Sequence, residues 1–218
     1  MHRRRSAASG VAALTLVLVA AAVAPVGAHD VVNAPVNLVD VRQALPVGVV
    51  ARVGIVPLTQ DHVERWRLIA SATAFLPRNM RERVALRGQV MQFLLLELWV
   101  RLEAREHGIG VTRAEAARAF AVAKRQSFPN DRDFRDFLRK SKMTQADARF
   151  QVRFNELYSK LGRHVINRAK TADGRLLLGE RFERELRRKW RSRTACGERY
   201  RSTQCGHVVR TQPLPAPP

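Results

Sequence analysis

Two cysteines are the residues with the clearest potential for chemistry, because Cys196 and Cys205 are the only cysteines in the chain and lie nine positions apart. Together with His207, and with His164 as a distant fourth ligand, they have donor atoms suited to zinc. Structural zinc sites usually bring their ligands in tight pairs such as C-x-x-C, and the spacing C-x8-C-x-H lacks such a pair. The spacing therefore favours a disulfide that pins the chain end after Trp190, with a metal site as the alternative.

The other residues that could act in catalysis do not form a recognisable set. The six histidines share no helical spacing, and the chain contains no HExxH, GxGxxG, Walker or GxSxG motif. Glu97 is a lone carboxylate in an apolar stretch, and we expect it to pair with a basic neighbour instead of acting as a catalytic acid. The sequence thus predicts no catalytic residue, no metal ligand and no cofactor, and it favours a protein that is not an enzyme.

The charge is strongly basic, with a formal net charge of +20 and a pI near 11.6. Such a balance suggests an anionic partner. However, 33 of the 39 basic residues are arginine, and acidic residues are interleaved with them up to about position 160. This distribution favours solvated basic helix faces, with a dedicated surface for a polyanion as the alternative.

The N-terminus has the pattern of an export signal. Three arginines precede an unbroken apolar run at 11–24, and Val26-Gly27-Ala28 suits a signal peptidase. The run is short for a membrane span, which needs about 20 residues, so we expect a signal peptide at 1–28, with an uncleaved N-terminal membrane anchor as the alternative. An exported chain meets oxidising conditions, which favours the disulfide, and export argues against specific binding of nucleic acid.

The chain is expected to be nearly all helical after a flexible leader at 29–48. The stretch 49–59 predicts a short strand, or a hairpin turned at Gly54. Thr59 is the expected N-cap of a helix that stops before Pro77. A long helix follows from Arg78 to His107, with Gly108 as its stop signal. Its apolar middle indicates the central core helix.

Shorter helices follow, and their starts are marked by capping sequences. "TRAE" at 112–115 is a capping box, and "TQAD" at 144–147 is a similar start. Between them, "DRDFRDFLRK" at 131–140 predicts a short helix. A last helix spans 175–194 and completes a domain at 49–194, followed by a disulfide-closed, proline-rich tail at 195–218.

The predicted fold class is all-α with a minor β-hairpin or strand. Core positions are expected on the central helix and at i+4 spacing on the last helix. They are Phe93, Leu95, Leu98, Trp99, Phe182, Leu186 and Trp190.

Three segments together resemble the N-terminal chaperone domain of SurA- and PrsA-type foldases. They are "VARVGIVPLTQDHVERW", "LLLELWVRLEAREHGIGVTRAEAARAFAVAKRQSF" and "DFRDFLRKSKMTQADARFQVRFNELYSKL", in that order, within about residues 49–168. The ending "FERELRRKWRSRTAC" is similar to the C-terminal helix and cysteine pair of secreted foldases of this type. The resemblance implies a SurA N-terminal-like multi-helix domain completed by a C-terminal helix.

The resemblance also implies an extracytoplasmic chaperone. Foldases of this type usually carry a parvulin prolyl-isomerase domain between the N-terminal and C-terminal helices, and no such insert is found near 169–175. We therefore expect binding of unfolded exported polypeptides without catalysis; a basic protein for anionic envelope surfaces, or for nucleic acid, and a prolyl isomerase are the alternatives. Four apolar residues in the least regular part are candidates for client binding, with ordinary core packing as the alternative: Phe128, Phe134, Phe137 and Met143.

Overall fold

The computed structural model describes residues 43–73 and 79–212. The predicted signal peptide or anchor, the leader up to residue 42 and the proline-rich end of the chain lie outside the described residues. Within the described ranges, none of the helices is long and apolar enough to cross a membrane.

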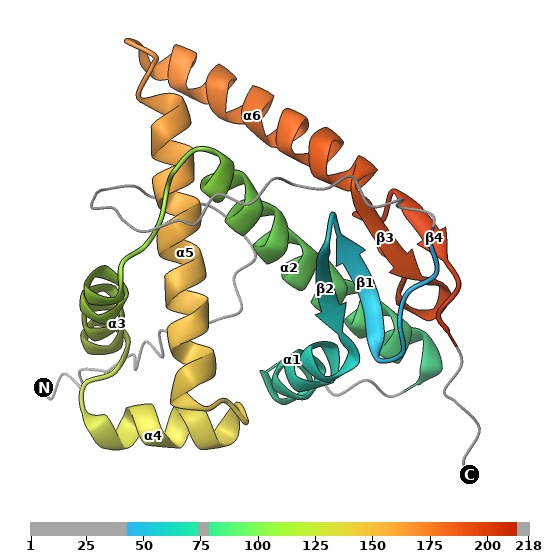
Figure 1. The fold of residues 1–218 in the computed structure, drawn as a ribbon. Coiled ribbons are helices and arrows are strands. Elements are labelled where there is room, and N and C mark those ends of the chain that lie inside the picture. Colours follow the sequence, from blue (N-terminus) through green and yellow to red (C-terminus); the bar gives the residue numbers. More distant parts are fainter. Residues whose placement is uncertain (1–42, 74–78, 213–218) are drawn as a thin grey trace, which may run out of the picture.

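The described chain is mostly helical, with a small sheet at one end (Figure 1). This confirms the predicted fold class. The elements in chain order are β1 (Val49–Val53), β2 (Val56–Thr59), α1 (Gln60–Thr73), α2 (Met80–Glu106), α3 (Arg113–Ser127), α4 (Asp131–Lys140), α5 (Gln145–Ile166), α6 (Ala172–Ser192), β3 (Thr194–Gly197) and β4 (His207–Val209).

Local signals in the sequence set most helix boundaries. Thr112 and Thr144 each close a capping box, in which the side chain accepts from the backbone N–H three residues on and an acidic side chain accepts from the cap's own N–H. Gly108 follows α2 with a φ of 66°, a left-handed conformation that glycine adopts without a steric cost. Gly54 has a φ of 57° and turns the hairpin between β1 and β2.

Helix α2 is the centre of the core. All but two of the residues from Val90 to Val100 are buried, as an apolar surface all round predicts. Its Phe93 ring packs against Trp66 of α1, at 4.8 Å between ring centroids, and against Phe154 of α5, at 5.7 Å. The aromatic contacts therefore tie α1, α2 and α5 into one unit.

Helix α6 completes this core, as predicted. Leu186 and Trp190 are buried, whereas Phe182 is half-buried. The indole N–H of Trp190 donates to the Glu103 carboxylate of α2 at 2.6 Å. The predicted core residues of α2, namely Phe93, Leu95, Leu98 and Trp99, are all buried.

The sheet joins the two ends of the described chain in the strand order β2-β1-β3-β4. β1 pairs antiparallel with both β2 and β3, and β3 pairs parallel with β4. The sequence predicts a hairpin at the start but no strand after α6. Leu45, which falls in the expected leader, is also fully buried and bridges Thr211. Residues on both sides of the predicted domain limits thus belong to the folded unit.

Candidate functional site: a groove with an apolar floor and an arginine rim

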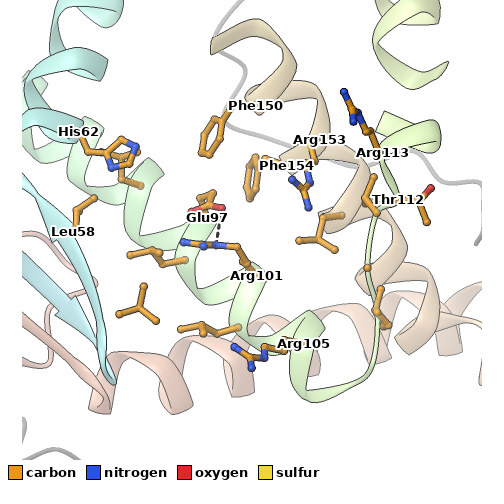
Figure 2. A pocket seen from close by; sticks show the side chains of 18 of the residues that line it. Leu58, His62, Glu97, Arg101, Arg105, Thr112, Arg113, Phe150, Arg153 and Phe154 are labelled. Atoms are coloured by element: carbon orange, nitrogen blue, oxygen red, sulfur yellow. Dashed lines mark ion pairs between the residues drawn. The ribbon is translucent and has the colours of Figure 1, made fainter. Parts of the chain in front are cut away.

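A groove of about 1200 Å³ lies between the β-hairpin, α2, α5 and the loop that joins α2 to α3 (Figure 2). Its volume exceeds that of ordinary small-molecule sites, which enclose roughly 300–1,000 Å³. The hairpin supplies Leu58, α2 supplies Leu98 and Leu102, and α5 supplies Phe154. The groove is therefore built from segments that are up to about a hundred residues apart in the sequence.

The floor of the groove is apolar and keeps part of its surface accessible. Leu58, Leu94 and Leu98 are buried beneath it. Other apolar side chains that line the groove are only half-buried, so each leaves carbon atoms that a ligand can cover. They are Val56, Leu102, Ile109, Phe150, Phe154 and Leu157.

The rim is positively charged. Four exposed arginines line the groove from α2, the start of α3 and α5: Arg101, Arg105, Arg113 and Arg153. Among the described lining residues, the only carboxylate is Glu97, and its Oε1 lies 3.1 Å from Nε of Arg101. This pair confirms the expectation that Glu97 pairs with a basic neighbour.

Glu97 is buried at the base of the arginine rim, and its surroundings act on the pKa of its carboxyl group in two opposite directions. Burial raises the pKa of Glu97 above its ordinary value, while the positive charges of Arg101, His62 and Arg153 offset part of the rise. These three groups come from α2, α1 and α5 and surround one carboxylate. The arginines around this single carboxylate give the base of the groove a positive local field.

A buried ion pair fixes the wall formed by the loop between α2 and α3. Lys160 of α5 donates to both carboxylate oxygens of Glu115, at 2.8 and 2.9 Å, and to the carbonyl oxygen of Gly110 at 2.9 Å. Glu115 also closes the capping box at Thr112. The loop that presents Ile109 and Thr112 to the groove is thus held at two points. One is the carbonyl oxygen of Gly110, which Lys160 contacts, and the other is the capping box at Thr112.

The four candidate client-binding residues lie elsewhere, around α4. Phe134 and Met143 are each 7% exposed, and Phe128 and Phe137 are half-buried. The Phe128 ring contacts Phe134 at 5.3 Å and Phe137 at 5.1 Å between centroids. None of the four lines the groove. The ring contacts among the three phenylalanines correspond to the core-contact alternative.

The cysteine pair forms the predicted disulfide. The Sγ atoms of Cys196 and Cys205 are bonded, with 5.8 Å between their Cα atoms. Cys196 lies in β3, so the bridge links this strand to the turn before β4. Within residues 43–73 and 79–212, no three histidine, cysteine or acidic side chains come together as a metal site would require.

Comparison of the chain with protein-family models, with curated proteins and with solved structures returned no match. Helix α5 ends at Ile166 and α6 begins at Ala172, so residues 167–171 alone connect these two helices.

Sequence reasoning did not identify the groove, because most of its lining residues have the patterns of ordinary amphipathic helices. Arg101 and Arg105 lie four residues apart, directly after the apolar middle of the long helix, and Arg153 lies between Phe150 and Phe154. The sequence did contain one signal of the groove, because basic side chains border the apolar stripes of these two helices. The pairing of these two borders across a cavity depends on tertiary packing.

Proposed function

We propose that the protein is an extracytoplasmic chaperone that binds unfolded exported polypeptides in this groove without catalysis. The observation that carries the proposal is the half-buried apolar floor in a cleft of about 1200 Å³. Unfolded chains expose apolar side chains that folded chains bury. A concave apolar surface binds such side chains with little demand on their order in the sequence, while a charged rim keeps the protein soluble.

The hairpin favours recognition through side chains instead of strand addition. β2 is the edge strand of the sheet that borders the groove, whereas β4 lies at the other edge. Pro57 in this strand has no N–H for pairing with an added strand. Clients are therefore held through contacts with the floor, and the export-signal pattern and the resemblance to foldases support their origin as exported chains.

Suppression of aggregation tests the proposal. The purified protein is added to an unfolded secreted protein during dilution from denaturant, and light scattering is followed at low and high salt. Apolar binding persists or strengthens at high salt, whereas polyanion binding falls steeply. We expect suppression at both salt concentrations.

A matched pair of variants locates the binding surface. Leu102→Asn/Ile109→Asn makes the floor polar, whereas Leu176→Asn/Leu177→Asn changes two leucines on α6 that are 64% exposed and lie outside the groove. We expect the first variant to lose most suppression and the second to keep it, with cooperative melting for both. Equal suppression by both variants contradicts the proposed site.

A second candidate function rests on the outer face of α6. Arg181, Arg184, Arg188 and Arg191 are exposed and recur at spacings of three and four residues, so they form one stripe along the helix. Across the described ranges, only Arg184 of these four has an ion pair, with Glu180 at 3.8 Å. Such a stripe suits an anionic envelope polymer or a nucleic acid.

Replacement of all four arginines by glutamine tests this second candidate. It abolishes binding of the anionic polymer and leaves aggregation suppression intact if the two functions are separate.

A further inference from the structure

The groove carries more positive charge than its own carboxylate can balance. Glu97 lies among Arg101, Arg153 and His62, and within the described part of the chain it forms an ion pair with Arg101 alone. Among the residues that the structure describes, neither Arg153 nor Arg113 has an ion pair. These guanidinium groups therefore have hydrogen-bond donors that a ligand can use.

Arginine at this position favours one class of anion. A guanidinium group presents a planar fork of N–H donors that matches a carboxylate in a two-point contact, and it is less strongly hydrated than an ammonium group. Arg101 and Arg153 project toward the same cavity from α2 and α5 (Figure 2). Glu97 keeps the Arg101 side chain, which is 53% exposed, over the floor of the groove.

Apolar surface lies directly beside these donors. Phe150 and Phe154 stand one helical turn apart on α5, on either side of Arg153 in the sequence, and Leu102 follows Arg101 on α2. A ligand that reaches both guanidinium groups therefore also covers the half-buried floor. This juxtaposition requires a ligand with carboxylate and apolar groups close together.

We propose that the groove selects polypeptide segments in which acidic side chains alternate with large apolar ones, with the carboxylates bound by Arg101 and Arg153 and the apolar side chains seated on the floor. This inference rests on the proposed function and specifies its client class. Free fatty acids share the chemistry of carboxylate and apolar chain, but the volume of the groove and its two separate arginines fit an extended segment with several carboxylates better.

Three labelled peptides, identical except for the residue that alternates with leucine, test the selection. Each has about ten residues, with leucine alternating with Glu, Gln or Lys, and binding is measured by fluorescence anisotropy. We expect the Glu peptide to bind about tenfold more tightly than the Gln peptide at about 50 mM salt, and the Lys peptide to bind most weakly. At about 500 mM salt the ratio between Glu and Gln peptides falls to about twofold, because exposed charges are screened.

The arginines are tested with a matched pair of variants. Arg101→Gln/Arg153→Gln removes two guanidinium groups of the rim, and Arg188→Gln/Arg191→Gln removes two exposed ones on α6. We expect the rim variant to bind the Glu and Gln peptides equally and to keep wild-type affinity for the Gln peptide. The α6 variant is expected to keep the tenfold preference.

The outcomes separate this inference from the proposed function. Equal affinity of the wild type for the Glu and Gln peptides overturns the selection and leaves groove binding intact. A Glu preference that survives in the rim variant also overturns it, because the acid-binding surface then lies elsewhere. If no peptide binds and the Leu102→Asn/Ile109→Asn variant still suppresses aggregation, the proposed function fails as well. Displacement of the labelled Glu peptide by a medium-chain fatty acid at a far lower concentration than by the unlabelled Glu peptide identifies a lipid ligand and contradicts the polypeptide assignment.

Discussion

At the scale of single residues, two buried carboxylates hold the helices together through partners that are distant in sequence. Glu103 of α2 accepts from Lys189 Nζ and from the Trp190 indole of α6, each at 2.6 Å, and lies 3.2 Å from Nε2 of His107. Glu115 of α3 forms its pair with Lys160 of α5. Each carboxylate accepts several hydrogen bonds, and these bonds offset the free-energy cost of burying its charge.

The first prediction concerns the acid stability of the contact at Glu103. Burial alone would raise the pKa of Glu103, but hydrogen bonds from Lys189 and Trp190 outweigh it and hold the pKa below its ordinary value. A lowered folded-state pKa gives a stabilisation that is present above the unfolded value, near pH 4.3, and is lost as the pH falls through the folded value. Glu103→Gln should cost about 1.5–3 kcal/mol at pH 7 and less at about pH 3. Urea unfolding at both pH values measures this, and an equal cost at the two contradicts it.

The second prediction concerns the buried pair that fixes the groove wall. Lys160→Met leaves Glu115 buried without its ammonium partner, and loss of one partner of such a pair costs about 3–5 kcal/mol. Lys160→Met/Glu115→Gln removes the uncompensated charge and should regain part of that loss. Thermal denaturation of the two variants and the wild type gives the comparison. A single variant as stable as the wild type would show that the pair contributes nothing.

Sequence reasoning succeeded for contacts within three or four residues and failed for these long-range ones. Each capping box, at Thr112 and at Thr144, joins two residues that are three positions apart. Its geometry therefore follows from the local sequence at the helix start. The contact between Glu103 and Lys189 spans 86 positions, and nothing local to either residue specifies the other. The same limit concealed the arginine rim, since Arg101 and Arg153 meet only after α2 and α5 have packed.

At the scale of secondary-structure elements, α6 is the element whose role the sequence predicted most fully. The i+4 spacing of Phe182, Leu186 and Trp190 indicated one docked face, and the last two are buried. The strands that follow were not predicted, because β3 has four residues and β4 has three. Strands this short carry little periodicity, and β3 exists because β1 provides its hydrogen-bonding edge.

The third prediction tests the docking of α6. Trp190 is 2% exposed, and its carbonyl oxygen accepts from the hydroxyl of Thr194, which in turn accepts from the indole of Trp99. Trp190→Ala should lower the free energy of unfolding by about 3–5 kcal/mol. Arg187→Ala and Arg188→Ala are the matched controls on the exposed face and should change it by less than about 0.5 kcal/mol. Chemical denaturation decides between these values, and a small effect of Trp190→Ala would mean that α6 is only loosely attached.

At the scale of the whole molecule, the fold closes on itself, because its last strands complete a sheet begun by its first. β3 lies beside β1, and Leu45 near the start of the described chain donates its N–H to the carbonyl oxygen of Arg210 near the end. The hairpin that forms one wall of the groove is thus supported by the C-terminal strands. The integrity of the groove depends on residues that do not line it.

The last prediction follows from this closure. A chain that ends before Arg175 lacks nearly all of α6 and the whole of β3 and β4, so it leaves the edge of β1 unpaired and removes Trp190 from its contact with Glu103. An unpaired edge and an uncovered core surface favour aggregation, and the missing packing of Leu186 and Trp190 is a large part of a typical stability of about 5–15 kcal/mol. We expect the truncated protein to retain helical far-ultraviolet dichroism, to bind a hydrophobic dye and to lose its cooperative melting transition. A chain that ends at Gln212 keeps every described element and is expected to melt like the full-length protein. If the shorter chain also melts cooperatively at the full-length temperature, α6 and the strands after it form an independent arm, and the arginine stripe on α6 becomes the better guide to function.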